Sequence, residues 1–296
     1  MNHSKRAFLC RLGLAGIAFA GVALGAAAAR ADTLDDIRQK GVLTVGTGVM
    51  GSQPWIWKAE DGSLTGMEYE MVQYIIKKLG VPKAEFVAVE WETLIPGLKA
   101  NRWDIIFSGM TITEERRQGA GIEFTRPYYF ESDRIVVKKG SPFQKPEDLA
   151  GKTLAAPVGT VEEYQAKQLI AKGIGKELKT FNDVASTFLA LQADQVDAVI
   201  MDNTSTAGQE KVTPDLRTIG GAYSLAADEK WQAAQAKAAY KYGGDGAGVR
   251  KEDVRLLQAL NDALDAMDAD GTRQKIMEKY GVWDESLTRE NMLAKP

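Results

Sequence analysis

The sequence predicts an α/β fold, because short apolar runs alternate along the chain with helix-like patterns. A helix repeats its apolar residues every three to four positions, whereas a buried strand is a short continuous apolar run. The helical patterns cover 67 to 79, 92 to 100, 161 to 172 and 183 to 193. The apolar runs fall at 42 to 46, 84 to 89, 104 to 107, 134 to 137, 153 to 158 and 197 to 201. Such alternation is typical of strands joined through helices.

Two segments resemble each other and indicate two similar halves. LKANRWDIIFSG at 98 to 109 and LQADQVDAVIMD at 191 to 202 share Leu, Ala, Asp and three apolar residues at matching offsets. Each predicts a helix that leads into a buried strand, although two unrelated αβ units can match this far by chance. Ligands of open α/β sheets bind beyond the carboxyl ends of the strands. We therefore expect Gly109 and Asp202 at corresponding strand ends that face one cleft.

The segment 104 to 116 predicts an anchor for an anion. Its apolar run is typical of a parallel strand covered on both faces, and Ser108, Gly109 and Thr111 stand where the run ends. Thr113 is expected to cap a helix whose first turn holds Glu114 and Glu115. This helix places Arg116 one turn from the strand end. A guanidinium there would clamp a carboxylate through two hydrogen bonds. The alternative is a solvated helix arginine.

The start of the chain predicts an export signal over residues 1 to 31. Basic residues precede an uncharged Ala/Gly/Leu run, and Ala29-Arg30-Ala31 has the small-x-small form of a signal-peptidase site. We expect cleavage after Ala31. An uncleaved membrane anchor is the alternative, which the weak hydrophobicity of the run disfavours. Lys5 stands where a twin-arginine signal has its first arginine, so the Sec and twin-arginine routes both stay open.

The composition of the mature chain excludes several chemistries. His3 and Cys10, the only histidine and the only cysteine, fall in the predicted signal. Residues 32 to 296 therefore lack the side chains for Ser-His-Asp or Cys-His catalysis and for zinc sites built on His or Cys, and we expect no cofactor. Removing four basic signal residues from the 37 of the whole chain leaves 33 against 40 acidic ones. This acidic balance disfavours binding to nucleic acid or an anionic membrane.

Several short motifs occur in one order along the chain. They are KGVLTVGT at 40 to 47, DGSLTGMEYEM at 61 to 71, GMTITEER at 109 to 116, VGT at 158 to 160, VDAVIMD at 196 to 202 and DGTRQKIMEKYG at 270 to 281. Together they resemble the periplasmic solute-binding proteins of family three, the amino-acid receptors of ABC importers.

The resemblance implies a two-lobed type II periplasmic-binding-protein fold with a ligand cleft between the lobes. It assigns 32 to 130 and 243 to 296 to lobe 1 and 131 to 242 to lobe 2, with the first crossing near Pro127. An Ala-, Lys- and Gln-rich stretch from 225 to 242 departs from the family pattern. We expect it to form an inserted helix on lobe 2.

The resemblance also assigns both charges of a free amino acid to particular residues. Arg116 is the carboxylate anchor, and backbone N–H groups of Thr160 and Val161, at a predicted helix start, would meet the same carboxylate. Asp202 is the acid that receives the α-ammonium, and the Gly109 carbonyl and a neighbouring threonine hydroxyl complete its shell. Taken singly, Thr160 and Asp202 are also explained as ordinary helix caps. Their joint order favours a binding site.

Aromatic residues are expected to form the walls of this site. Trp91 in EWETLIPGL matches a family position over the ligand, although core packing is the plain alternative, and Trp55 lies in the loop after the first strand. Cation-selective relatives often place an acid in that loop, and none stands there in this chain. Aromatic walls would suit an apolar, aromatic or methylated-ammonium group. The predicted ligand-binding residues are Arg116, Asp202, Gly109, Thr111, Thr160, Val161, Trp91, Trp55 and Ser108.

The implied function is capture of an amino acid or close derivative by hinge closure, and its delivery to the permease of an ABC importer. The protein would be a periplasmic monomer without enzymatic activity. The main alternative is a cyclohexadienyl-dehydratase-like enzyme, which needs a carboxylic acid over the cleft, for which Glu68 and Glu131 are candidates. A receptor sensor domain is disfavoured by the polar end at Pro296. An opine, ectoine or a betaine is the alternative ligand.

Overall fold

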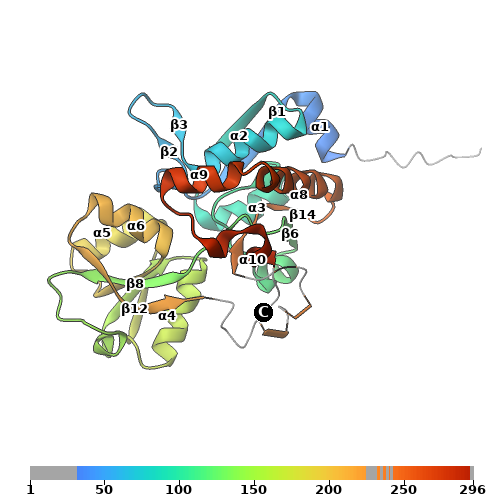
Figure 1. The fold of residues 1–296 in the computed structure, drawn as a ribbon. Coiled ribbons are helices and arrows are strands. Elements are labelled where there is room, and N and C mark those ends of the chain that lie inside the picture. The colour runs from blue at the N-terminus through green and yellow to red at the C-terminus, as the bar shows by residue number, and fades with distance from the viewer. Residues whose placement is uncertain (1–31, 225–231, 234–235, 238–239, 241–242, 294–296) are drawn as a thin grey trace, which may run out of the picture. The chain divides into compact units, whose positions relative to one another are not determined.

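The computed structural model describes residues 32–224, 232–233, 236–237, 240 and 243–293. Within them the chain forms two mixed five-stranded sheets with helices packed around each (Figure 1). The first sheet has the strand order β4-β1-β5-β14-β6, and the second has the order β10-β9-β11-β8-β12. The predicted α/β class is confirmed. None of the described helices has the length and apolar character that a membrane crossing requires.

The first sheet combines strands from distant parts of the chain. β1 (Val42–Thr47) lies parallel to β4 (Lys83–Ala88) and to β5 (Ile105–Ile106). β14 (Gly248–Arg250) runs antiparallel to both β5 and β6 (Ile122–Phe124). A strand near the C-terminus therefore completes the sheet that the N-terminal part begins.

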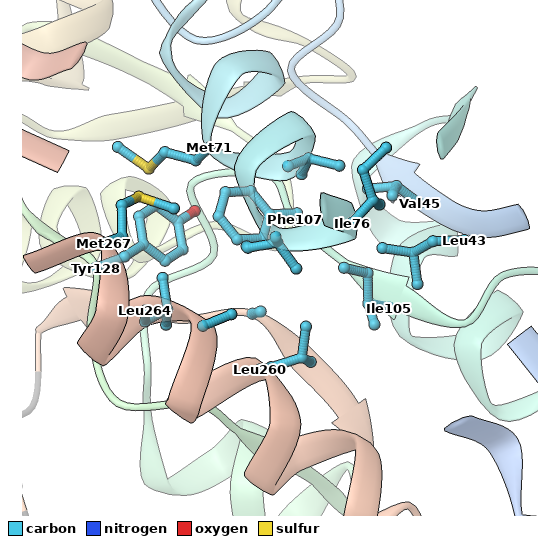
Figure 2. Packing of buried hydrophobic residues seen from close by; sticks show 14 of the residues in the cluster. Leu43, Val45, Met71, Ile76, Ile105, Phe107, Tyr128, Leu260, Leu264 and Met267 are labelled. Carbon is cyan, nitrogen blue, oxygen red and sulfur yellow. The ribbon is translucent and has the colours of Figure 1, made fainter. Parts of the chain in front are cut away.

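The core of the first sheet lies between its strands and two long helices, as Figure 2 shows. Met71 comes from α2 (Met67–Leu79) and Leu264 from α8 (Val254–Ala269), and both pack with Phe107 from the end of β5. These side chains are at most 2% exposed. Burying each such side chain contributes roughly 1.5–3 kcal/mol. The remaining helices of this half are α1 (Thr33–Lys40), α3 (Leu94–Lys99), α9 (Thr272–Tyr280) and α10 (Arg289–Leu293).

The second sheet uses one continuous stretch of the chain. β9 (Thr153–Pro157) lies parallel to β10 (Glu177–Phe181) and β11 (Ala198–Asp202). β8 (Asp133–Lys138) runs antiparallel to β11 and β12 (Leu216–Tyr223). The carboxyl ends of the three parallel strands therefore meet at one edge of the sheet.

At that edge each parallel strand leads into a helix with a polar cap. The helices are α4 (Val161–Ala171), α5 (Val184–Gln192) and α6 (Asn203–Val212). Their caps are Thr160, Asp183 and Asp202, whose side-chain oxygens accept the N–H of Glu163, Ser186 and Ser205. A side-chain oxygen at this position satisfies a backbone donor that has no partner within its helix. The sequence thus sets three helix N-termini side by side.

Two short strands connect the halves. β7 (Tyr129–Phe130) follows the last N-terminal strand of the first sheet, and β13 (Gly244–Asp245) precedes β14. β7 and β13 pair with each other in antiparallel register. The other short elements are β2 (Trp57–Lys58), β3 (Leu64–Thr65) and the 3-10 turns Trp91–Thr93, Pro146–Leu149 and Glu285–Leu287.

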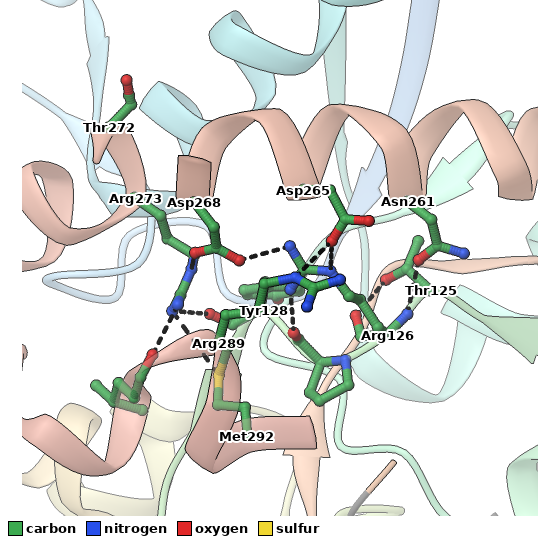
Figure 3. A network of polar contacts seen from close by, with 12 residues as sticks. Thr125, Arg126, Tyr128, Asn261, Asp265, Asp268, Thr272, Arg273, Arg289 and Met292 are labelled. Atoms are coloured by element: carbon green, nitrogen blue, oxygen red, sulfur yellow. Dashed lines mark hydrogen bonds and ion pairs between the residues drawn. The ribbon is translucent and has the colours of Figure 1, made fainter. Parts of the chain in front are cut away.

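A buried charge network holds the first crossing against the C-terminal helices (Figure 3). Asp268 accepts hydrogen bonds from Arg126 Nη2 at 2.6 Å and from Arg273 Nε at 2.5 Å. Arg126 Nε also bonds Asp265 at 2.8 Å, and Arg273 donates to the carbonyl of Tyr128 at 3.1 Å. Every charge in this network therefore faces an opposite charge or a hydrogen-bond partner.

Several sequence expectations are confirmed and others need correction. The helix expected over 67 to 79 ends where α2 ends, and the apolar runs fall within one or two residues of the strands. The helix expected over 92 to 100 is instead a 3-10 turn followed by α3. The helix expected after Thr113 is a π-helix, Glu115–Gly119. Residues 1 to 31 and most of 225 to 242 lie outside the described residues.

Candidate functional site

A small enclosed cavity, which we call the inner cavity, lies where strand ends of the two sheets meet. Its volume is about 40 Å³. A wider outer cavity of about 510 Å³ adjoins it and shares the lining residues Gly48, Trp91, Asn182, Asp183, Val184 and Ser205. The predicted site residues that line the inner cavity are Trp55, Trp91, Gly109, Thr111, Arg116, Thr160, Val161 and Asp202. Residues far apart in the sequence are thus brought to one enclosed space.

Arg116 is held by the π-helix against two backbone carbonyls. The hydroxyl of Thr113 accepts the backbone N–H of Arg116 at 3.2 Å, as expected for a helix cap. The guanidinium donates to the carbonyl of Thr111 at 2.6 Å and to that of Gly159 at 3.5 Å, and it lies 5.5 Å from the ring centre of Trp91. Burial lowers its pKa, yet a guanidinium stays protonated. Among the described lining residues it is the only cationic one.

The start of α4 differs slightly from the predicted capping box. Thr160 Oγ1 accepts the Glu163 N–H at 3.2 Å, as expected. The Glu163 carboxylate reaches back to the N–H of Gly159 at 2.7 Å, one residue earlier than a capping box requires. The N–H groups of Thr160 and Val161 lie at a helix N-terminus, which carries a partial positive charge. This end of α4 is suited to an anion.

Asp202 serves both as a helix cap and as a wall of the inner cavity. It is 5% exposed, and its Oδ1 accepts the N–H of Ser205 at 2.5 Å. The carboxyl group of Glu131 lies close to that of Asp202, and like charges at the two positions repel each other. Burial raises the pKa of Asp202, and the hydrogen bonds from Ser205 oppose that shift. Asp202 can therefore cap its helix and also contact a ligand.

The two tryptophans occupy different positions. Trp55 is 2% exposed, packs edge-on against Tyr129 at 5.5 Å, and donates from Nε1 to the hydroxyl of Ser205 at 3.2 Å. Trp91 is half-buried and donates from Nε1 to the carbonyl of Gly159 at 3.1 Å. Both indoles thus bond residues of the second half of the fold.

Ser108 does not line the cavity but supports it. Its buried hydroxyl accepts the N–H of Gly48 at 2.8 Å. Glu68 supports the next residue, because its Oε1 accepts the N–H of Gly109 at 2.6 Å and the hydroxyl of Tyr128 at 2.5 Å. Burial raises the pKa of Glu68 to about 7. Glu68 is therefore a positioning residue behind the cavity wall, and it does not line the inner cavity.

Three acids that the resemblance did not assign to the ligand also line the inner cavity. They are Glu131, Glu162 and the exposed Asp183. Glu131 follows the first crossing strand, and Glu162 stands in the first turn of α4. An acid in a first helical turn is common, so the sequence offers no signal that separates Glu162 from a surface residue. The pairing of β7 with β13 and the position of β9 beside β11 bring Glu131 and Glu162 close to Asp202.

The carboxyl groups around the inner cavity exceed the cations available to pair them. Burial, followed by the charges of Asp245 and Asp202, raises the pKa of Glu131 well above its ordinary value. Asp133 stands directly opposite Asp202 on the neighbouring strand, an arrangement that repels like charges. Asp245 is fully buried, and neither of its carboxylate oxygens has a hydrogen-bond partner among the described residues. Burial raises the pKa of Asp245 as well. This region is poised to receive positive charge.

Among the described residues no group of three or more Asp, Glu, His or Cys side chains is arranged to hold a metal ion.

Comparison with known proteins identifies the family. The model for bacterial extracellular solute-binding proteins, family 3, matches residues 43–282. The chain belongs to this family, and its fold is the two-lobed type II periplasmic-binding-protein fold with a ligand cleft between the lobes.

Similar proteins with assigned ligands bind amino acids. The L-cystine-binding protein TcyJ of Escherichia coli K12 is 28% identical over 83% of this chain and 85% of its own length. The L-arginine-binding protein of Pseudomonas aeruginosa is 31% identical over 78% and 85%. The crystal structure of the ancestral amino acid-binding protein AncCDT-1, a precursor of cyclohexadienyl dehydratase, aligns with a TM-score of 0.70 and 30% identity over 84% and 99%. These curated relatives are binding proteins rather than enzymes.

Proposed function

We propose that this protein captures an amino acid or a close derivative in the inner cavity and delivers it to the permease of an ABC importer. The observation that carries the proposal is the placement of Arg116 and Asp202 on the walls of one enclosed cavity. A buried zwitterion requires a partner for each of its charges, because an unpaired buried charge is very costly. The family membership and the amino-acid ligands of the relatives support the same function.

In this proposal the ligand carboxylate lies between Arg116 and the N-terminus of α4. The guanidinium supplies the charge, and the N–H groups of Thr160 and Val161 supply further donors. The ammonium group binds Asp202, with the Gly109 carbonyl and the Thr111 hydroxyl as additional acceptors. The indole of Trp91 covers the ligand beside the guanidinium.

Hinge closure follows from the division of these contacts. Arg116 and Thr111 belong to the lobe of the first sheet, whereas Thr160 and Asp202 belong to that of the second. A ligand that contacts both lobes stabilises their closed arrangement, and the paired strands β7 and β13 are the natural hinge. A permease would then recognise the closed form. Export by the signal at residues 1 to 31 would place the mature monomer in the periplasm.

Two substitutions test this assignment. Arg116→Ala and Asp202→Asn are each expected to weaken amino-acid binding about 100-fold or more, because each leaves one ligand charge without its partner. Calorimetric titration of the mature protein, first screened by thermal shift against amino acids, opines, ectoine and betaines, provides the measurement. Arg102→Ala and Asp61→Asn change exposed residues of the same types and serve as controls. Unchanged affinity in both site variants would refute the assignment.

A dehydratase-like enzyme is the second candidate, and one observation favours it. Glu131 lines the inner cavity as a carboxyl group whose pKa is raised by burial, which suits a general acid. Turnover of prephenate or arogenate by the wild-type protein, lost in Glu131→Gln, would establish the enzyme. Binding of an amino acid without turnover of either compound would exclude this candidate.

A further inference from the structure

The charges of the inner cavity do not balance for an ordinary amino acid. Glu131, Glu162 and Asp202 line it together with the exposed Asp183, and Arg116 is the only cation among its described lining residues. In the proposed function Arg116 pairs with the ligand carboxylate and Asp202 with the α-ammonium. Glu131 and Glu162 then have no opposite charge.

We propose that Glu131 and Glu162 form a second cation subsite beside Asp202, so that the ligand is a short-chain diamino acid with a second ammonium group close to the first. This inference rests on the proposed function, because it takes the α-carboxylate and α-ammonium positions from it. It adds the location of a further positive charge and the chemical class of the ligand.

The hydrogen bonding of Glu131 supports this subsite. Oε2 of Glu131 is inaccessible to solvent and has no hydrogen-bond partner among the described residues. A buried acceptor without a partner is uncommon in native proteins and marks a position for an absent group. Because Glu131 lines the inner cavity, a ligand there is within its reach.

Two acids behind the cavity wall also favour a second ammonium group in the ligand. Asp245 pairs with Thr111 in an isolated bridge, and neither of its carboxylate oxygens has a described partner. Asp133 faces Asp202 across the paired strands. Each of these acids strengthens the negative potential at Glu131, since buried charges are poorly screened. An ammonium group supplies both the opposite charge and N–H donors.

The length of the ligand follows from where the enclosed acids lie. Glu90 lines the outer cavity and Asp183 lines both cavities, but both of these acids are exposed to solvent. Water already solvates an exposed carboxylate, so an ion pair with the ligand at that position contributes little to binding. Glu162 is 7% exposed and Asp202 5%, so water compensates them poorly. A second ammonium group therefore gains most when it stays near the first, as in 2,4-diaminobutyrate, rather than at the end of a lysine side chain.

Calorimetric titration with a matched ligand set tests the subsite. We expect L-2,4-diaminobutyrate to bind about 10- to 100-fold more tightly than asparagine or L-2-aminobutyrate, which have similar size but no second ammonium, and also more tightly than lysine or arginine. Glu131→Gln should bring the affinity for diaminobutyrate to within about 3-fold of the affinity of the same variant for 2-aminobutyrate. Glu90→Gln, the same change at an exposed acid, should leave the preference intact.

Proton release gives a second readout that needs no variant. Burial raises the pKa of Glu131, and a second ammonium group beside it lowers that pKa again. Diaminobutyrate binding to wild-type protein should therefore release more protons than 2-aminobutyrate binding, measured by titration in buffers of different ionisation enthalpy. Equal affinity for asparagine or 2-aminobutyrate, absence of this additional proton release, or tighter binding of lysine with no dependence on Glu131 would each overturn the subsite. If no amino acid binds at all, the proposed function itself fails.

Discussion

Two regions of the molecule that bury several charged side chains differ in how those charges are paired. Behind the first crossing, Asp268 lies between Arg126 and Arg273, and each of the three has a charged or carbonyl partner within 3.1 Å. Around the inner cavity, Glu131 and Asp245 retain carboxylate oxygens without a described partner. The same chain therefore pairs its buried charges behind the crossing and leaves acids without described partners near the cavity. This difference supports the proposal that a ligand supplies the positive charge there.

The largest effect is expected from breaking the paired network. Asp268→Asn removes the shared charge between Arg126 and Arg273 and should lower the free energy of unfolding by about 3–5 kcal/mol. Urea denaturation of the two proteins measures the difference. Asp265→Asn serves as the control, because Asp265 is 44% exposed and its ion pairs should contribute about 1 kcal/mol or less. Equal losses in the two variants would contradict the distinction between buried and exposed pairs.

The next effect concerns the pH dependence of stability through Glu68. Its pKa rises from 4.5 to about 7 on folding, so the folded state binds the proton more tightly than the unfolded state. The stabilisation is present below pH 4.5 and is lost as the pH rises through 7, by about 3 kcal/mol at most. Glu68→Gln should therefore flatten the fall in unfolding free energy between about pH 5 and 8. Glu60→Gln, at an exposed acid, should leave the pH profile unchanged.

A smaller effect with the opposite sign is expected at Asp245. Asp245→Asn removes a buried charge without a described partner, and it should raise the free energy of unfolding of the ligand-free protein by about 1 kcal/mol at pH 8. The gain should shrink as the pH falls, because burial raises the pKa of Asp245 and its carboxyl group is therefore neutralised at a higher pH than that of an ordinary aspartate. Denaturation at pH 8 and at about pH 5 is the measurement. A loss of stability at pH 8 would show that Asp245 is already compensated in the free protein.

The parts of the fold that depend on local patterns were predictable from the sequence. The apolar periodicity located α2, and the strand leading to Asp202 was recognised from its continuous apolar run. The π-helix that carries Arg116 was not, since its first residues satisfy the same capping pattern as an α-helix. In a π-helix each backbone hydrogen bond reaches one residue further along the chain than in an α-helix. The tertiary contacts of Arg116 favour this arrangement.

The lining of the inner cavity, which is the candidate site, was predictable where a family motif carried it and not elsewhere. Arg116, Thr160 and Asp202 lie in motifs, and the structure places all three on the inner cavity. Ser108 lies in the same motif as Arg116, yet its hydroxyl points to Gly48 instead. Glu131 and Asp245 approach the cavity only because β7 pairs with β13, a contact between residues more than 100 positions apart. Such non-local pairing leaves no periodic signal in a single sequence.

The most direct test of the central claim is to remove the carboxylate charge of the ligand. Once the amino acid that binds most tightly is known, the wild-type protein is titrated with that compound, with its α-amide and with its decarboxylated amine. If Arg116 and the start of α4 hold the carboxylate, both derivatives should bind about 100-fold or more weakly than the parent amino acid. Equal affinity for the amine and the parent would show that Arg116 is no carboxylate anchor and would contradict the account.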